Sequence, residues 1–185
     1  MLNDTVCIIL TGGKSRRMGT DKAMLTLDGR AMCLRLAEEF APLAPVYFAV
    51  DRAGRFPTER FGELADRWPG QGPLNGIVSA FRGTEAAYAL LMATDMPCCT
   101  AAAAERLAAA IGDHEACLFG SEPLFGLYGR ACLSAAEGCL AEGNNAMRAM
   151  LERVDVIRLA AEDEALFTNL NTPEEFRTFA RGRKT

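Results

Sequence analysis

Metal-ligating residues are scarce in this sequence. It contains one histidine, His114, and its seven cysteines include no Cys-x-x-Cys pair. A zinc site built from cysteine and histidine needs several such ligands at short spacings, so the composition argues against one. An odd number of cysteines also does not suit a framework of paired disulfides. We therefore expect free thiols that pack as small apolar side chains.

Long hydrophobic runs and an excess of basic residues are missing as well. No apolar stretch reaches the roughly 20 residues that span a bilayer, and residues 1–5 lack the basic flank of a signal or transit peptide. The formal net charge of −4 argues against broad binding to nucleic acid or to a membrane surface. We expect a cytoplasmic protein with neither as a partner. A single nucleotide is not excluded, because local cations decide its binding.

Strand and helix signals alternate along the chain. With 185 residues, 50% of them apolar, the sequence suits one domain over residues 1–185. Expected strands span residues 6–10, 46–50, 61–65, 88–93, 115–119, 125–128 and 154–159. Expected helices span residues 31–40, 73–81, 101–111, 131–141 and 146–153, and a last helix begins at Thr172-Pro173-Glu174-Glu175 with threonine as N-cap. This order predicts an α/β fold, a three-layer α/β/α sandwich around a mostly parallel Rossmann-like sheet.

The most informative stretch follows the first expected strand and reads Leu10-Thr11-Gly12-Gly13-Lys14-Ser15-Arg16-Arg17-Met18-Gly19-Thr20-Asp21-Lys22. Adjacent glycines let the backbone turn tightly and approach a ligand closely, and bare N–H groups in such a loop form an anion site. Four cations surround the turn: Lys14, Arg16, Arg17 and Lys22. The spacing fits neither a Walker loop nor a dinucleotide fingerprint. We interpret the loop as a triphosphate site at the end of a first strand.

This run resembles the signature of the nucleotidyltransferases with a Rossmann-like fold, Leu-x-Gly-Gly-x-Ser-x-Arg-Met-Gly-x-Asp-Lys. Within that superfamily it is most similar to the molybdenum cofactor guanylyltransferases, from Val6 to about Phe179. The resemblance implies a fold of the nucleotide-diphospho-sugar transferase type and transfer of GMP from GTP to molybdenum-molybdopterin. Mg²⁺ is the implied cofactor, and the implied partners are proteins that deliver molybdopterin and receive the finished cofactor.

The resemblance also assigns roles within the first loop. The implied nucleotide-binding residues there are Leu10, Thr11, Gly12, Gly13 and Lys22. The implied catalytic residues of the loop are Arg17 and Lys22, whose positive charges offset the charge on the triphosphate.

Asp95 is the second informative position. It follows the expected strand at residues 88–93, which contains no other charge, and Pro97 then bends the chain away. Open α/β sheets bind ligands at the carboxyl ends of their strands, where this carboxylate is expected. The resemblance implies that Asp95 binds the catalytic Mg²⁺ and contacts the nucleotide. The alternative is an N-cap for the helix at residues 101–111, for which Thr100 is better placed.

A third segment runs from Leu64 to Ile77 and contains Asp66 followed by Gly72-Pro73-Leu74-Asn75-Gly76. It is similar to the family pattern of an aspartate followed by Gly-Pro-Leu-x-Gly, in which the aspartate contacts the nucleotide and the loop builds part of the guanine pocket. A carboxylate suits guanine, because N1–H and N2–H₂ are both donors. Whether Asp66 meets the base or another part of GTP stays open, as does an ordinary Gly/Pro turn for this segment taken alone.

Two later segments also match the family. Residues 123–128 resemble its segment near the molybdopterin side, and residues 169–173 resemble its Asn-x-Asn-Thr-Pro motif close to the active site. We expect Asn169 and Asn171 to point to the same side of an extended stretch. Their amides either bind the second substrate or tie down the last helix, and both roles stay open.

The chain departs from the family pattern in two places. Gly143-Asn144-Asn145 stands where the family often has a basic pair suited to an anionic pterin, and Arg148 or Arg153 is a candidate replacement for that charge. Ala49 stands where the second strand often ends on an asparagine near the base. These changes concern pterin affinity and base selectivity. They leave the expected phosphate and metal residues intact.

Three alternative functions fit less well. Cytidylyltransferases acting on the same pterin tend to carry Ala-Ala-Gly in the first loop and to lack Gly-Pro-Leu-x-Gly. Sugar-phosphate nucleotidyltransferases are usually longer. A non-catalytic nucleotide-binding partner in molybdoenzyme maturation does not account for an intact Lys22 and Asp95, and a turnover assay separates it from an enzyme.

Overall fold

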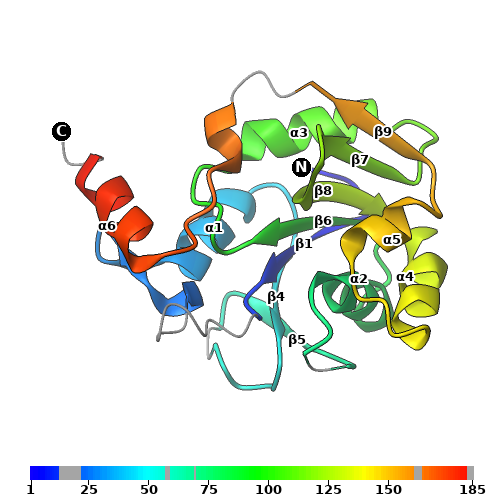
Figure 1. Cartoon of the computed structure of the whole chain (residues 1–185), viewed down its shortest axis with the longest axis horizontal. Helices are drawn as coiled ribbons and strands as arrows, with labels where there is room; N and C mark the ends of the chain where they lie inside the picture. Colours follow the sequence, from blue (N-terminus) through cyan, green and yellow to red (C-terminus); the bar gives the residue numbers. More distant parts are fainter. Residues whose placement is uncertain (13–21, 57–58, 69, 161–163, 183–185) are drawn as a thin grey trace.

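A seven-stranded sheet forms the centre of the protein (Figure 1). The computed structural model describes residues 1–12, 22–56, 59–68, 70–160 and 164–182. The strand order is β5-β4-β1-β6-β8-β7-β9. Their bounds are β1 Thr5–Leu10, β4 Val46–Val50, β5 Gly62–Ala65, β6 Tyr88–Ala93, β7 Ala116–Phe119, β8 Glu122–Gly129 and β9 Val156–Leu159. Strand β8 is antiparallel to both of its neighbours, and the other neighbouring pairs are parallel.

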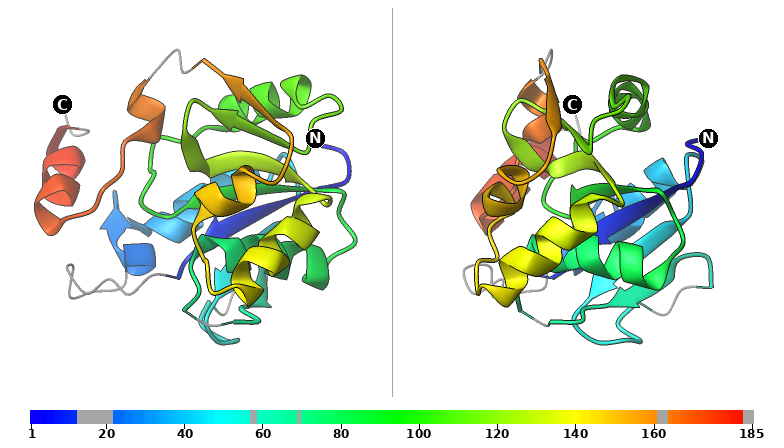
Figure 2. Two further views of the ribbon diagram at one scale, coloured as in Figure 1. Left: turned by 45° about the vertical axis from the view of Figure 1, so that its right-hand side comes forward. Right: turned by 90° about the vertical axis from the view of Figure 1, so that its right-hand side faces the viewer.

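Helices cover both faces of this sheet (Figure 2). One face packs against α1 (Met32–Phe40) and α3 (Ala101–Ala110), and the other against α2 (Pro73–Gly83), α4 (Cys132–Ala141) and α5 (Met147–Leu151). Ile8 and Ile9 are both fully buried but belong to the clusters on opposite faces, because successive strand side chains alternate. The predicted three-layer α/β/α sandwich with a mostly parallel sheet is confirmed.

The structure differs from the predicted elements mainly at their ends. Strand β8 is longer than the expected residues 125–128, and α5 is shorter than the expected residues 146–153. A small antiparallel hairpin, β2 (Thr26–Leu27) and β3 (Arg30–Ala31), was not predicted. Its turn residues have positive φ angles, 52° at Asp28 and 78° at Gly29. Asp-Gly is a strong signal for such a two-residue turn, and the flanking strands are too short to show alternation.

Helix α6 (Pro173–Gly182) packs on this hairpin and stands apart from the central sheet (Figure 1). Phe176 and Phe179 contact a small buried cluster of Leu27, Met32 and Leu170. The predicted N-terminal cap of the helix is confirmed: the Glu175 N–H donates to Thr172 Oγ1 at 3.1 Å, and the Thr172 N–H donates to Glu175 Oε2 at 3.1 Å. Two short 3₁₀ segments, η1 (Lys22–Met24) and η2 (Glu164–Phe167), complete the described elements.

Arg130 holds the C-terminal end of α2 through hydrogen bonds. Its guanidinium donates to the carbonyl oxygens of Phe81 at 2.8 Å, Thr84 at 2.7 Å and Ala86 at 2.9 Å. Carbonyl groups at a helix C-terminus have no partner within the helix, so this side chain replaces the missing hydrogen bonds. With its C-terminus held in this way, α2 carries its N-terminus to the opposite edge of the sheet.

All seven cysteines are free, as expected, and six of them are buried. Burial raises the pKa of Cys7 and of Cys132 to about 12, so these thiols stay protonated and pack as apolar groups. No helix within the described ranges is long and apolar enough to cross a bilayer.

Candidate active site at the carboxyl edge of the sheet

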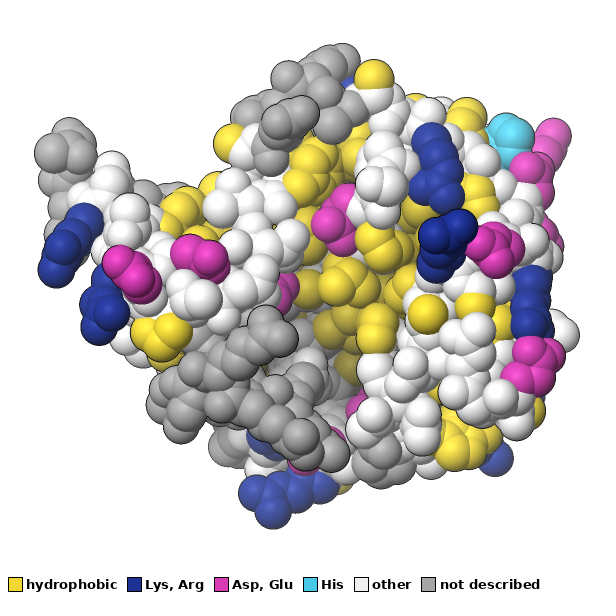
Figure 3. Space-filling model, viewed as in Figure 1, with side chains coloured by type: hydrophobic (Ala, Val, Ile, Leu, Met, Phe, Trp, Pro, Cys, Tyr) yellow, Lys and Arg dark blue, Asp and Glu magenta, His cyan; other side chains and the backbone are white. Residues whose placement is uncertain are grey.

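The segments singled out in the sequence meet at one edge of the sheet. The parallel strands β5, β4, β1 and β6 all end there, so Asp66, Thr11 and Asp95 follow their strands to the same side. Figure 3 shows this face hollowed between α6 and the body of the molecule, with hydrophobic side chains gathered in the hollow and acidic side chains among them. Edges of this kind are where open α/β sheets bind ligands.

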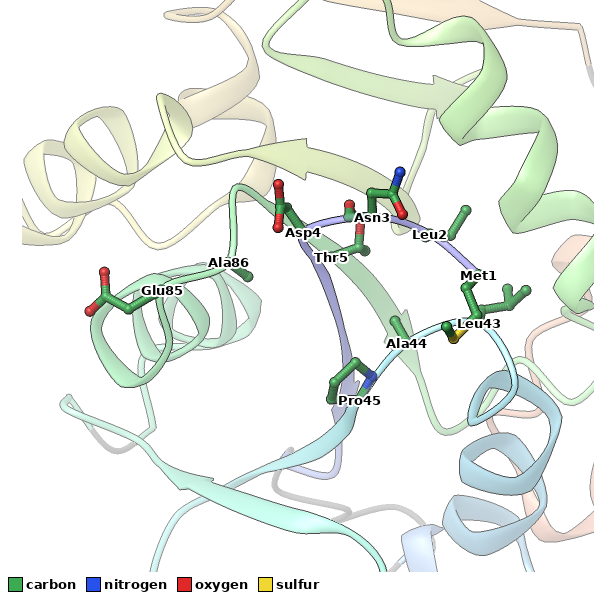
Figure 4. Close-up of a pocket in the computed structure, with 10 residues that line it drawn as sticks. All are labelled: Met1, Leu2, Asn3, Asp4, Thr5, Leu43, Ala44, Pro45, Glu85 and Ala86. Carbon is green, nitrogen blue, oxygen red and sulfur yellow. The ribbon is translucent and has the colours of Figure 1, made fainter.

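A second hollow lies at the opposite edge, beside the amino ends of β1, β4 and β6 (Figure 4). Its volume is about 440 Å³, and it is lined by Met1, Leu2, Asn3, Asp4, Thr5, Leu43, Ala44, Pro45, Glu85 and Ala86. None of the residues expected to bind the nucleotide lines it. The carboxyl edge is therefore the candidate active site.

The end of β1 is held firmly between its two neighbours. Thr11 donates to the carbonyl oxygen of Ala49 twice, from its N–H at 3.3 Å and from Oγ1 at 2.6 Å. On the other side, Thr94 Oγ1 donates to the Leu10 carbonyl at 3.3 Å. The exit of the chain from β1 toward the glycine loop is thus fixed by both flanking strands.

Gly12 is exposed at this exit. A Cβ atom built there would meet no heavy atom of the described residues within 4 Å, and its φ angle lies outside the left-handed region. The described protein atoms therefore do not by themselves require glycine at this position. Glycine has no Cβ atom, so it leaves room for a ligand to approach the backbone here.

The rest of the first loop lies mostly outside the described residues. Gly13 and Arg17 fall in the stretch 13–21, as do Lys14 and Arg16. The backbone of Lys22 begins η1, but the position of its side chain is not described. The roles of Gly13, Arg17 and Lys22 therefore stay predictions.

Packing explains most of the Gly-Pro-Leu-x-Gly motif. Gly72, the N-cap of α2, has φ 74° and ψ −163°, a conformation that an L side chain rarely adopts. Pro73 occupies the first helical position, and Leu74 is fully buried. A Cβ atom at Gly76 would lie 2.4 Å from Leu10 Cδ2, so glycine lets α2 pack closely on β1.

The same motif places the N-terminus of α2 at the candidate site. The first backbone N–H groups of a helix have no partner within it and carry a partial positive charge, which favours an anionic ligand. The motif therefore serves both the fold and the electrostatics of the carboxyl edge.

Asp66 is held at the end of β5, where its N–H donates to the Val50 carbonyl at 2.7 Å. Burial raises the pKa of its carboxyl group from 3.8 to about 6. A hydrogen bond from the Asn75 side chain lowers the pKa, nearby Asp51 raises it, and Arg55 lowers it. At neutral pH the group is therefore ionised, and an ionised carboxylate only accepts hydrogen bonds.

Asn75 and Arg55 are two site residues that the sequence reasoning missed. Asn75 is fully buried in the first turn of α2, at the variable position of the motif. Buried amides are almost always hydrogen-bonded, so a polar residue between Leu74 and Gly76 was the available signal. Arg55 donates to Thr11 Oγ1 at 3.3 Å and lies 3.5 Å from Asp51. No local pattern marks that long-range contact.

Asp95 lies just after β6, partly exposed, with its Oδ1 atom buried. Its carbonyl oxygen accepts a hydrogen bond from the Leu170 N–H at 2.8 Å, which brings residues 169–171 to the same site. The alternative that Asp95 caps α3 is wrong, because Thr100 Oγ1 accepts from the Ala103 N–H at 3.2 Å. Asp95 lies at the carboxyl edge, and its role as a metal ligand stays a prediction.

The two asparagines of the late motif are placed differently. Asn169 is half-buried, and its Nδ2 atom donates to the Phe167 carbonyl at 3.2 Å. Asn171 is exposed, and its N–H donates to Glu175 Oε2 at 2.6 Å. Asn169 lines a hollow of about 560 Å³ together with Thr168, Leu170, Thr172, Glu174, Glu175, Thr178 and Phe179. The segment ties down α6, and its role toward the second substrate stays a prediction.

The segments expected near the pterin give mixed support for binding an anionic pterin. Residues 123–128 lie in β8, which runs antiparallel to β6 and so brings its first half to the carboxyl edge. Arg148 pairs with Glu152 at 2.9 Å, and Arg153 pairs with Glu142 at 2.5 Å. Each guanidinium is thus matched by a carboxylate. These arginines do not restore the net positive charge that a basic pair would supply.

Oxygen ligands for a metal ion are few at the site. Within the described ranges there is no cluster of three or more histidine, cysteine, aspartate or glutamate side chains that could hold a metal ion. Mg²⁺ binds through one or two carboxylates, several waters and substrate phosphates. A single carboxylate such as Asp95 therefore fits this metal, with the remaining ligands supplied by a phosphorylated substrate and water.

An α/β sheet whose parallel strands end in Thr11, Asp66 and Asp95 at one edge is typical of nucleotide-binding proteins. Residues 7–159 match the model of the MobA-like NTP transferase domain, and the chain belongs to this family. It is 35% identical over 191 residues to the molybdenum cofactor guanylyltransferase of Rhizobium meliloti, covering 92% of this chain and 88% of the relative. The enzyme of that name from Cereibacter sphaeroides is 34% identical, with 91% of each chain covered.

Solved structures show the same fold. Molybdopterin-guanine dinucleotide biosynthesis protein A from Archaeoglobus fulgidus superposes with a TM-score of 0.83 at 21% identity, covering 97% of this chain and 98% of that one. The 2-C-methyl-D-erythritol 4-phosphate cytidylyltransferase from Thermus thermophilus gives a TM-score of 0.72 at 13% identity, covering 96% and 98%. With its family membership, this identifies the protein as a nucleotidyltransferase enzyme.

Proposed function

We propose that the protein transfers GMP from GTP to molybdenum-molybdopterin, forming the molybdopterin guanine dinucleotide cofactor and releasing pyrophosphate. Relatives named molybdenum cofactor guanylyltransferase, 34% to 35% identical over most of the chain, support this reaction. The observation that carries it is the meeting of four segments with family motifs at one edge of the sheet. These are Leu10–Gly12, the Asp66 loop with the N-terminus of α2, Asp95, and Asn169–Asn171.

The reaction requires positioning and compensation of charge. A phosphate oxygen of molybdenum-molybdopterin attacks the α-phosphorus of GTP, and the bond from that phosphorus to the oxygen bridging the β-phosphate breaks as pyrophosphate leaves. Phosphoryl-type transfers of this kind need little covalent chemistry from the protein. The open backbone at Gly12 and the N-terminus of α2 are suited to hold phosphate oxygens. By resemblance, Arg17 and Lys22 offset the charge of the triphosphate.

Asp95 is the residue proposed to hold Mg²⁺. When bound, the metal neutralises negative charge on the phosphates. The fit of the donor set supports this assignment, because the carboxylate lies at the carboxyl edge and Mg²⁺ prefers oxygen ligands.

Asp66 is proposed to recognise guanine. Its pKa of about 6 leaves it ionised at neutral pH, and an acceptor-only group matches the N1–H and N2–H₂ donors of that base. Cytosine and adenine do not offer this pair of adjacent donors. Asp66 is partly buried, so a base that leaves its carboxylate unpaired is a poorer substrate.

The remaining assignments follow from the reaction. Molybdopterin is delivered and the finished cofactor is received by protein partners, and residues 169–171 face the second substrate. A cytoplasmic location is part of the proposal and is supported by seven free thiols, which a reducing compartment preserves.

Thermal unfolding in Mg²⁺ with GTP, CTP or ATP at matched concentrations tests the nucleotide. We expect the largest rise in Tm with GTP, because binding to the folded state alone stabilises it. Equal shifts with GTP and CTP would contradict the proposed selectivity, and a larger shift with CTP would favour a cytidylyltransferase. Pyrophosphate release with molybdenum-molybdopterin tests catalysis. Protection by GTP without release would favour the non-catalytic alternative.

A further inference from the structure

Asn75 makes an unusual set of contacts for a helix residue. It is 0% exposed, and its side chain reaches back from the first turn of α2 to the loop before the helix. Oδ1 accepts a hydrogen bond from the Trp68 N–H at 3.3 Å, and Nδ2 donates to the Trp68 carbonyl at 3.1 Å. One amide thus pairs with both backbone polar groups of a loop residue. A side chain used in this way fixes the loop relative to the helix.

The same amide also acts on Asp66. Hydrogen bonding from the Asn75 side chain lowers the pKa of the Asp66 carboxyl group, against the larger effect of burial. It therefore favours the ionised form, which only accepts hydrogen bonds. The two hydrogen bonds between Asn75 and Trp68 hold the chain two residues after Asp66.

The loop itself needs such a support. It contains two glycines with positive φ angles, 83° at Gly70 and 74° at Gly72, and glycine leaves the backbone many alternative conformations. Trp68 is partly exposed, at 39%, so packing of its side chain does not fully fix the loop. A buried helix side chain that bonds the loop backbone at Trp68 is therefore a constraint on the chain next to Asp66.

We propose that Asn75 is a positioning residue for base recognition: its buried amide holds the loop of residues 66–72 so that the Asp66 carboxylate faces the nucleotide. This inference rests on the proposed function, in which Asp66 binds the base. It assigns a role in specificity to the variable position of the Gly-Pro-Leu-x-Gly motif.

Asn75→Ala and Asn75→Asp test the proposal. Alanine removes both hydrogen bonds to Trp68 and the amide that lowers the pKa of Asp66. Aspartate keeps the shape and the acceptor for the Trp68 N–H, but it loses the donors and places a second carboxylate beside Asp66. Ser79→Ala is the matched control, because Ser79 is buried in the same helix and donates from Oγ to the Ala65 carbonyl at 3.4 Å, in strand β5 and outside the loop.

The first readout is kinetic. With both Asn75 variants we expect KM for GTP to rise about tenfold, in line with the loss of one or two hydrogen bonds to the base, while kcat changes less. The preference for GTP over CTP should fall by a similar factor. Ser79→Ala should leave both quantities unchanged. If the Asn75 variants lower only Tm and keep KM and the GTP preference, the residue is merely structural and the proposal is wrong.

The second readout uses the only tryptophan of the chain, Trp68, whose backbone Asn75 holds. Quenching of its fluorescence by acrylamide, measured without substrate, should increase in both Asn75 variants and stay unchanged in Ser79→Ala. Unchanged quenching in the Asn75 variants would overturn the proposal. This measurement does not depend on the reaction, whereas a failure of the proposed function shows in the wild-type protein as absent GTP protection or turnover.

Discussion

Replacement of Asp66 by asparagine should raise stability and weaken nucleotide binding together. Burial holds the pKa of Asp66 at about 6 instead of 3.8, so ionisation of this group opposes folding at neutral pH. Asparagine has nearly the same shape, keeps an oxygen that accepts from Asn75, and carries no charge. Asp66→Asn therefore removes the unfavourable burial of a charge while it removes the charged acceptor proposed for guanine.

The magnitude follows from the pKa shift. A shift from 3.8 to about 6 is about two units, and each unit corresponds to about 1.4 kcal/mol, which sets an upper limit of about 3 kcal/mol. Asp66 is only partly buried, so solvent screening reduces the expected gain to about 1 kcal/mol. For a chain of this size that gain corresponds to a rise in Tm of about 2–4 °C.

The pH dependence has a defined sign. A raised carboxyl pKa means that the folded state binds the proton more tightly than the unfolded state, so Asp66 lowers wild-type stability as pH rises from about 4 to 6. The variant lacks this effect. The difference in Tm between variant and wild type should be close to zero near pH 4 and complete above about pH 7.

Paired thermal unfolding curves across this pH range measure the difference, and effects of other titrating groups cancel between the two proteins. The rise in Tm caused by GTP, measured at pH 7.5, should shrink in the variant toward the rise caused by CTP. A variant that is less stable than wild type at pH 8, or a difference in Tm that does not change with pH, would refute the reasoning about Asp66.

The positions of the main strands, and the carboxylates that follow them, could be predicted because of how parallel sheets bury their strands. Strands covered on both faces are apolar at nearly every position, so residues 6–10 and 88–93 are continuous hydrophobic runs. The polar residues that directly follow such runs must lie at the edge of the sheet, which is where Thr11 and the pair Thr94-Asp95 are found. Local pattern and topology rules were sufficient for this part.

Contacts between distant segments could not be predicted in this way. The hydrogen bond from Leu170 to Asp95 and the contact of Arg55 with Thr11 depend on how loops of irregular conformation pack. Asn75 was treated as a variable position, since neither helical period nor motif spacing shows which buried groups an amide meets. The two segments of residues that form the hairpin β2–β3 were too short for a periodic signal.

The glycines of the two nucleotide motifs answer different physical demands. Gly72 requires a positive φ angle, and Gly76 allows close packing of α2 on β1, so both are explained by the protein's own structure. Gly12 has no positive φ angle, and a Cβ atom there would meet no described atom within 4 Å. A motif match alone treats these glycines alike, whereas the geometry separates a glycine that the fold requires from one that a ligand would require.

Three further comparisons of variants test the site. Gly72→Ala should lower the free energy of unfolding by about 1–3 kcal/mol, because Gly72 has a positive φ angle. Gly12→Ala should keep Tm and weaken the protection by GTP. If only Gly12→Ala lowered Tm, Gly12 and not Gly72 would be the glycine that the fold requires. Asp95→Asn should abolish transfer and leave the unfolding curve intact, and near-normal turnover at limiting Mg²⁺ would exclude it as the metal ligand. Lys22→Ala should lower turnover by about 10²–10³ and Lys14→Ala much less, because removal of one positioned charge stabiliser typically has that effect. If the two lysines only raise the local potential, both variants lose activity modestly and regain it together as salt is lowered. Steady-state assays of both variants at two ionic strengths separate these outcomes, and comparable losses would mean that the loop is a basic patch without a positioned catalytic lysine.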